Sequence, residues 1–89
     1  MIQAFNKDPE ARKDYGFDWS AWLDTDTITT STWTLPDGIT SYAESNTTTG
    51  ATIWLSGGTS GTDYLVTNQI TTTGGRIEQR SLKIQVREQ

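Results

Sequence analysis

The chain has 89 residues, enough for one small domain, and only 33% of them are apolar. Its net charge is −4. The chain contains no cysteine and no histidine, and their absence excludes disulfides, thiol nucleophiles, the usual neutral-pH base and the common zinc ligands. Thr occurs 17 times. Because Thr suits a half-solvated strand, the composition favours β-structure.

The start of the chain differs in pattern from the rest, so we divide it into an N-terminal arm (1–13) and a β-sandwich domain (14–89). The first seven residues are weakly patterned and fit either a short edge strand or an arm. Asp8-Pro9 is a typical helix start, because Asp caps the first turn and Pro suits its first position. Residues 9–13 suffice for one helical turn but not for a stable helix.

Alternation of apolar and polar residues begins at residue 15 and predicts strands. Every second residue from 15 to 23 is apolar, so we expect one strand over 15–23, followed by a turn at 24–26. Residues 27–35 predict the next strand. Ile28 and Trp33 have opposite parity within it, which indicates a β-bulge or a change of face between them.

The middle of the chain alternates short strands with turn sequences. Within one of these strands Ile53 and Leu55 share a face, and Trp54 lies on the other. In chain order we expect a turn at 36–38, a weak strand at 39–45, a polar loop at 46–50, a strand at 51–56 and a glycine loop at 57–61.

Residues 61–86 form the most regular part of the chain. Every second residue from 64 to 70 is apolar except Asn68, and every second residue from 82 to 86 is apolar. Gly74-Gly75 between them supplies the positive φ angles of a tight turn. Two antiparallel strands joined as a hairpin are therefore predicted.

Six or seven short strands with frequent turns are typical of an all-β, immunoglobulin-like Greek-key sandwich, here of about seven strands after the arm. Tyr64 begins the penultimate strand, where such sandwiches place a tyrosine whose hydroxyl bonds to upstream backbone, the tyrosine corner. Trp19 and Trp33 are predicted to be core residues.

Charge is distributed unevenly along the chain. Residues 14–63 hold seven acids and no Lys or Arg, whereas residues 64–89 carry a net charge of +2. We expect no nucleic-acid partner, because that function needs a concentrated basic face. The asymmetry fits either ordinary solvated charge or a head-to-tail contact between copies. No apolar run is long enough to span a membrane, and the N-terminus has no signal-peptide pattern.

Catalysis and metal binding find little support in the sequence. The seven serines have no histidine to activate them, so we predict that the chain is not an enzyme. Asp24 and Asp26, with Asp18 or Asp63, are candidate calcium ligands, but their spacing does not match an EF-hand. A turn whose side chains bond local backbone is the preferred interpretation, and we predict no catalytic, metal or cofactor site.

Trp22 and Trp54 have the opposite parity to the apolar face of their predicted strands, which indicates outer-face positions. Exposed tryptophans are enriched at interfaces. The alternatives are a core position or cover by the arm. Sugar stacking on Trp22, Trp54 and Tyr42 is a further alternative. The predicted interface residues are Trp22, Trp54, the arm residues Ile2 and Phe5, and Arg76 and Arg80 near the hairpin tip.

Three segments resemble one family: DYGFDWSAWL, TSTWTLPDG and the SGGTSGTDYLVTN block followed by GGR. Over residues 8–88 the chain is similar to immunoglobulin-like structural proteins of tailed bacteriophages, often labelled fibre–tail adaptor proteins. The resemblance implies a virion protein in the tail of a short-tailed phage, made in the host bacterial cytoplasm. Its implied partners are the tail tube or nozzle, the tail fibre and copies of itself. A capsid decoration protein and a carbohydrate-binding module are the alternatives.

Overall fold

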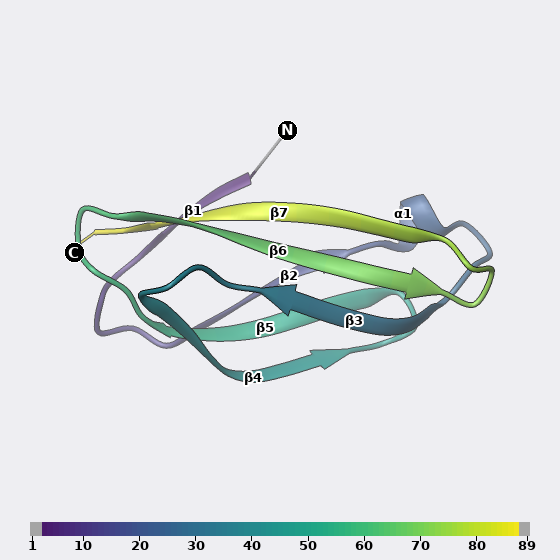
Figure 1. Ribbon diagram of the computed structural model, residues 1–89, viewed down its shortest axis with the longest axis horizontal. Coiled ribbons are helices and arrows are strands. Elements are labelled where there is room, and N and C mark those ends of the chain that lie inside the picture. The colour runs from purple at the N-terminus through teal and green to yellow at the C-terminus, as the bar shows by residue number, and fades with distance from the viewer. Residues whose placement is uncertain (1–2, 88–89) are drawn as a thin grey trace.

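A computed structural model describes residues 3–87, and within them the chain forms seven strands and one helical turn (Figure 1). The elements are β1 (Gln3–Lys7), β2 (Lys13–Asp18), α1 (Ser20–Leu23), β3 (Ile28–Thr34), β4 (Ile39–Asn46), β5 (Gly50–Gly57), β6 (Asp63–Thr72) and β7 (Ile77–Val86).

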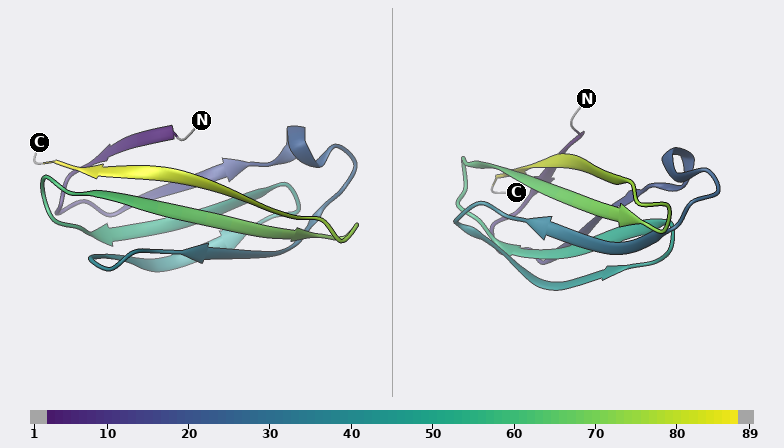
Figure 2. Two further views of the ribbon diagram at one scale, coloured as in Figure 1. Left: turned by 45° about the horizontal axis from the view of Figure 1, so that its top comes forward. Right: turned by 45° about the vertical axis from the view of Figure 1, so that its right-hand side comes forward.

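The strands form two packed layers. Within residues 3–87, one sheet has the order β1-β7-β6-β3 and the other the order β2-β5-β4. Neighbours are antiparallel except β1 and β7, which pair in parallel. Figure 2 shows the layers from two sides, with α1 at the end opposite the last strand's C-terminus. The predicted all-β sandwich is confirmed, and so is the β6–β7 hairpin. An immunoglobulin domain divides its strands between two sheets in a similar way. The immunoglobulin-like class of this sandwich stays a prediction.

Alternation along the strands builds the core between the sheets. The inward residues of β5 and β7 are almost completely buried, as the period-2 pattern predicted. A second apolar cluster lies at the α1 end of the sandwich. The main cluster is Tyr15, Trp33, Ile39, Ala51, Ile53, Leu55, Tyr64, Val66, Leu82, Ile84 and Val86; the second is Trp19, Leu23, Ile28 and Ile70.

The strand predicted over residues 15–23 is wrong in its second half. β2 ends at Asp18, and residues 20–23 form the helical turn α1. The Leu23 N–H donates to the Trp19 carbonyl at 2.9 Å, closing that turn. Trp19 and Leu23 are four residues apart, a spacing that fits both the period of a strand and one face of a helix, so parity alone could not separate the two.

The segment before residue 13 is an edge strand followed by a turn. Of the two possibilities for the first seven residues, residues 3–7 adopt the edge strand, paired with β7 from Gln3↔Leu82 to Lys7↔Val86. Residues 9–13, which suffice for one helical turn at most, form no helix, and the Ala11 N–H instead donates to the Asp8 carbonyl at 3.0 Å and closes a tight turn. Residues 3–7 therefore add a strand to the four-stranded sheet, while the division of the chain into an arm and a domain stays a prediction. Ile2 lies outside the described residues.

Two edge strands contain bulges. The register of β3 shifts between Ile28 and Thr30, which confirms the bulge predicted from the parity of Ile28 and Trp33. The register of β4 shifts between Ser41 and Ala43 and leaves Tyr42 unpaired in the ladder. The Tyr42 side chain is correspondingly exposed.

Candidate functional site

Trp19 is the centre of a buried polar network at the α1 end. Its side chain is fully buried, and its Nε1–H donates to Asn68 Oδ1 at 3.0 Å. Asn68, also fully buried, donates through Nδ2 to Ser31 Oγ at 2.9 Å and to the Thr32 carbonyl at 3.2 Å. The residue that interrupts the apolar face of β6 is thus the acceptor for a core indole. Sequence reasoning missed this role, although the polar residue at a core position was its signal.

Two arginines cover the tryptophans of this end. The Trp19 and Trp22 rings meet edge to face, with centroids 5.5 Å apart. Arg80 lies over the Trp19 ring at 4.2 Å and Arg76 over the Trp22 ring at 4.3 Å. Trp22 is half-buried against the second core cluster. The outer-face position predicted for Trp22 assumed a strand over residues 15–23, but residues 20–23 form the helical turn α1.

Arg76 and Asp26 join the β6–β7 hairpin to the loop after α1. Arg76 Nε lies 3.2 Å from Asp26 Oδ2, and Arg76 Nη2 donates to the Leu23 carbonyl at 3.0 Å. The Thr72 hydroxyl, the N–H groups of Thr27 and Gly74, and Arg76 lower the pKa of Asp26 to about 2. Asp26 Oδ1 accepts the N–H of its neighbour Thr27, a local bond of the kind that the turn interpretation expected, and also the N–H of the distant Gly74. No group of three or more acidic side chains among residues 3–87 gathers to hold a metal ion.

Arg80 is less engaged than Arg76. Among residues 3–87 its guanidinium has no hydrogen-bond acceptor, although its charge helps to lower the pKa of Asp18. The larger causes of that shift are hydrogen bonds from the hydroxyl and the N–H of Ser20. Arg76 is held by the fold, whereas the Arg80 donors remain available to solvent or a partner.

Trp54 lies on the outer face of the three-stranded sheet. It is half-buried, in register with Asp14 on β2 and Ala43 on β4. Tyr42 is 49% exposed, and Arg12 lies over its ring at 5.5 Å. No ring contact among the described residues joins Trp22, Trp54 and Tyr42, and sugar stacking on them stays a prediction.

The N-terminal strand packs inward. Phe5 is half-buried, with its ring 5.3 Å from that of Tyr15. Lys7 is fully buried, and its Nζ donates to the Gly57 carbonyl at 2.7 Å and the Asp8 carbonyl at 3.0 Å. Burial lowers the pKa of Lys7. Lys7 therefore links β1 to the end of β5 by a hydrogen bond. In a strand Lys7 lies on the same face as Phe5, and this was the sequence signal for its inward position.

Tyr64 and Trp33 are the other two residues singled out by the sequence. Tyr64 Oη accepts the Thr59 N–H at 2.9 Å, which is the geometry of a tyrosine corner and which lowers the tyrosine pKa. Gly38 has φ of 101°, and a Cβ there would lie 3.0 Å from the Tyr64 ring. Trp33 is buried and stacks on Phe17 with centroids 5.9 Å apart.

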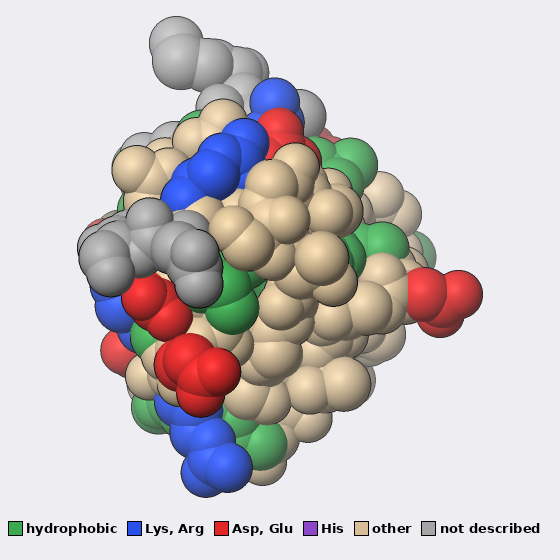
Figure 3. All heavy atoms as spheres, turned by 90° about the vertical axis from the view of Figure 1, so that its left-hand side faces the viewer, with side chains coloured by type: hydrophobic (Ala, Val, Ile, Leu, Met, Phe, Trp, Pro, Cys, Tyr) green, Lys and Arg blue, Asp and Glu red, His purple; other side chains and the backbone are tan. Residues whose placement is uncertain are grey.

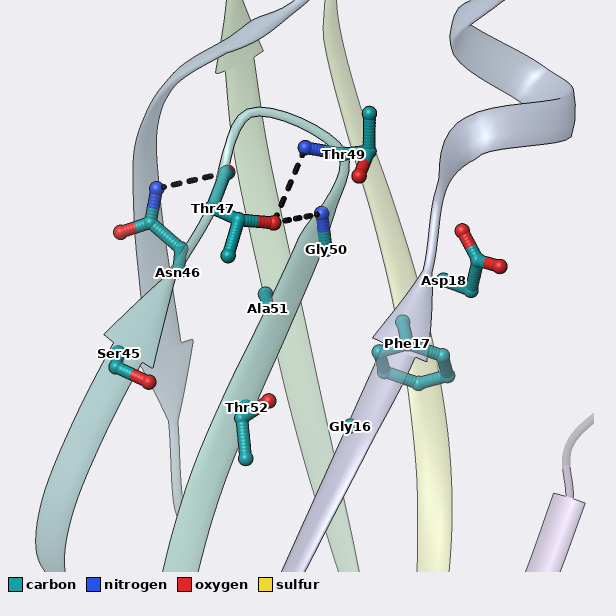
Figure 4. A pocket seen from close by; sticks show the side chains of 10 residues that line it. All are labelled: Gly16, Phe17, Asp18, Ser45, Asn46, Thr47, Thr49, Gly50, Ala51 and Thr52. Atoms are coloured by element: carbon teal, nitrogen blue, oxygen red, sulfur yellow. Dashed lines mark hydrogen bonds between the residues drawn. The ribbon is translucent and has the colours of Figure 1, made fainter.

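A shallow hollow lies over the three-stranded sheet near α1 (Figure 4). Its volume is about 370 Å³, and its walls are mostly small or hydroxyl-bearing residues. The Thr47 hydroxyl accepts the Gly50 N–H at 3.1 Å, so this group stabilises the loop itself. The lining residues are Gly16, Phe17, Asp18, Ser45, Asn46, Thr47, Thr49, Gly50, Ala51 and Thr52.

Charged side chains of both signs mix on the surface. Figure 3 shows the end of the sandwich at the left of Figure 1, where positive and negative groups lie close together. One such pair is Arg87 Nη2 and Asp63 Oδ1, 2.9 Å apart. Among residues 3–87 no helix is long and apolar enough to cross a membrane.

Taken together, these features define a small all-β module with distinct outer faces and free sheet edges. Residues 7–85 match the family described as podophage GP4 fiber-tail adaptor protein gp77, and the chain belongs to this family. The resemblance found in the sequence is thereby confirmed. The chain is a structural protein of the phage particle, a fibre–tail adaptor, whose family role is to join tail components. Among curated proteins, none matches the chain.

Proposed function

We propose that this chain is a non-enzymatic connector between the tail tube and the tail fibres of a short-tailed phage. The single observation behind the proposal is the family match over residues 7–85. The absence of histidine and cysteine from the sequence agrees with a role that needs no reaction centre. Contacts with the tail tube, the fibre and further copies would use the free sheet edges and outer faces of the sandwich.

Trp54, Tyr42 and Arg80 are the surface residues best suited to such contacts. Each keeps part of its side chain accessible, and aromatic and arginine side chains are enriched at the centres of interfaces. Arg76, Trp22 and Phe5 are more strongly engaged within the chain. A partner contact through Ile2 remains a proposal.

Quantitative peptide mass spectrometry of purified virions tests the proposal. A connector of the tail should be present at about six or twelve copies per particle, or a small multiple, in keeping with the closed rings of symmetric assemblies. Copies on the order of hundreds would instead indicate decoration of the capsid. Absence of the chain from purified particles would contradict a structural role in the virion.

A further inference from the structure

The two sheets of the sandwich both end on the same side, and a cleft lies between their last strands. β3 is an edge of the four-stranded sheet and β4 an edge of the three-stranded sheet, and both lie at the bottom of the left view of Figure 2. The cleft has a volume of about 170 Å³. Ser31 and Trp33 from β3 and Glu44, Ser45 and Asn46 from β4 line it.

The Trp33 side chain lines this cleft, and its indole carries an unpaired hydrogen-bond donor below the surface. Its side chain is only 9% exposed, and its buried Nε1–H has no acceptor among residues 3–87. Buried donors in folded proteins are nearly always paired, and an unpaired one destabilises the fold. A partner that shifts the Trp33 ring at the cleft and supplies an acceptor would remove this cost.

β3 is also the least protected edge of the sandwich. Its sequence, ITTSTWT, contains no charged residue and no proline, and its only register shift lies at its first residues. Each other edge has a protecting feature: β1 contains Lys7, β2 contains three charged residues, and β4 contains a central bulge and Glu44. An unprotected edge presents unpaired backbone N–H and C=O groups to another strand.

The charge around this edge selects the partner. Residues 14–63 contain no Lys or Arg, while Asp37 lies in the turn between β3 and β4, and Glu44 borders the cleft. Two copies joined edge to edge would bring these acids together, which is unfavourable. The chain's own basic strand, β7, lies between β1 and β6 and offers no free edge to a second copy.

We propose that an extended segment of another polypeptide, carrying Lys or Arg, adds as a strand to the free edge of β3. One of its acceptors, such as a backbone carbonyl, takes the Trp33 Nε1–H, and a basic side chain faces Glu44. Recognition of this kind draws affinity from main-chain hydrogen bonds and specificity from alternate side chains. The inference rests on the proposed function, which supplies the partner as another protein of the tail.

The test is incorporation of edge variants into virions, with the chain supplied in trans to a phage that lacks it. Thr32→Lys puts a positive charge on the exposed β3 edge, and Gln69→Lys puts the same charge on the registered residue of the central strand β6. Glu44→Lys reverses the acid at the cleft, and Glu78→Lys reverses an exposed acid on β7. Thermal unfolding of each purified variant establishes that it folds.

We expect Thr32→Lys and Glu44→Lys to lower the copies per particle roughly tenfold or more, because like charges then face the partner strand. Gln69→Lys and Glu78→Lys should remain within about twofold of wild type. If the folded edge variants enter particles as well as their controls do, the strand-addition inference is wrong while the adaptor function stands. If the wild-type chain itself is absent from particles, the adaptor function fails first.

Discussion

Two buried tryptophans of this sandwich differ in how their indole N–H groups are satisfied. Trp19 donates to Asn68 at 3.0 Å and lies beneath the Arg80 guanidinium. Trp33 is comparably buried, but its N–H has no acceptor among residues 3–87 and its side chain lines the cleft between β3 and β4. The first indole donates within an internal network, and the second has no partner among the described residues.

The comparison shows that burial alone does not identify a structural residue. Natural folds pair most of their buried polar groups, and among residues 3–87 the Tyr15 hydroxyl and the Trp33 Nε1–H are the side-chain exceptions. The same distinction separates Arg76, held by Asp26 and the Leu23 carbonyl, from Arg80, whose donors have no acceptor among the described residues. The Trp19 network and Arg76 thus maintain the fold at the α1 end, whereas Arg80 and the β3 edge are suited to a contact.

The largest expected effect comes from breaking the Trp19 network. Asn68→Ala removes the acceptor of a buried indole and leaves a cavity, so we expect a loss of about 3 kcal/mol in the free energy of unfolding. Gln69→Ala, on the outer face of the same strand, should cost less than about 1 kcal/mol. Urea unfolding of both variants measures this, and equal costs would show that the network does not stabilise the fold.

A matched pair of substitutions tests the two indoles directly. Trp19→Phe and Trp33→Phe remove similar volumes, but only the first leaves the Asn68 Oδ1 without its donor. We expect Trp19→Phe to cost about 1–3 kcal/mol more than Trp33→Phe, because Trp33→Phe also relieves an unpaired buried donor. The free energies come from chemical denaturation, and the reverse order would contradict the comparison.

A smaller effect should separate the two arginines. Arg76→Ala loses an ion pair, a hydrogen bond and a cation–π contact, but solvent weakens the ion pair because the Arg76 side chain is 45% exposed. We expect a cost of about 1–2 kcal/mol. Arg80→Ala loses mainly its contact with Trp19 and should cost about 0.5–1 kcal/mol. Thermal unfolding distinguishes them, and a larger cost for Arg80→Ala would reverse our assignment.

The smallest effect is a pH dependence at the α1 end. The pKa of Asp26 is about 2 in the folded chain against an ordinary value of 3.8. The unfolded chain therefore takes up the proton first as pH falls, so the stabilisation by Asp26 is complete above about pH 4 and is lost towards pH 2. Asp26→Asn should remove this part of the acid sensitivity. An unchanged profile between pH 4 and pH 2, measured by thermal unfolding, would show that Asp26 does not contribute it.

The sequence predicted the sheets well because alternation reports burial on a pleated surface. Leu82, Ile84 and Val86 are buried as expected, and the parity of Ile28 and Trp33 located a bulge. Alternation failed to predict the helical turn α1, because the four-residue spacing of Trp19 and Leu23 fits both a strand and one face of a helix.

The candidate site was harder to predict, because its features depend on residues distant in the sequence. Asn68 was visible as a polar residue in an apolar pattern, but its partner lies 49 residues away in the chain. The unpaired Trp33 donor is a property of three-dimensional surroundings and has no local sequence signal. Phe5 and Trp22, both predicted to lie at interfaces, are partly buried against the core clusters, and their interface role stays a prediction.

Exchange of the two indole protons with solvent tests the central distinction most directly. Nitrogen-15 NMR of the free chain resolves the Trp19 and Trp33 Nε1–H groups and follows their hydrogen exchange. We expect the Trp19 proton to exchange roughly tenfold more slowly or better, since only it is held by a hydrogen bond. Equal protection of the two protons, or stronger protection at Trp33, would contradict the distinction between a paired and an unpaired indole.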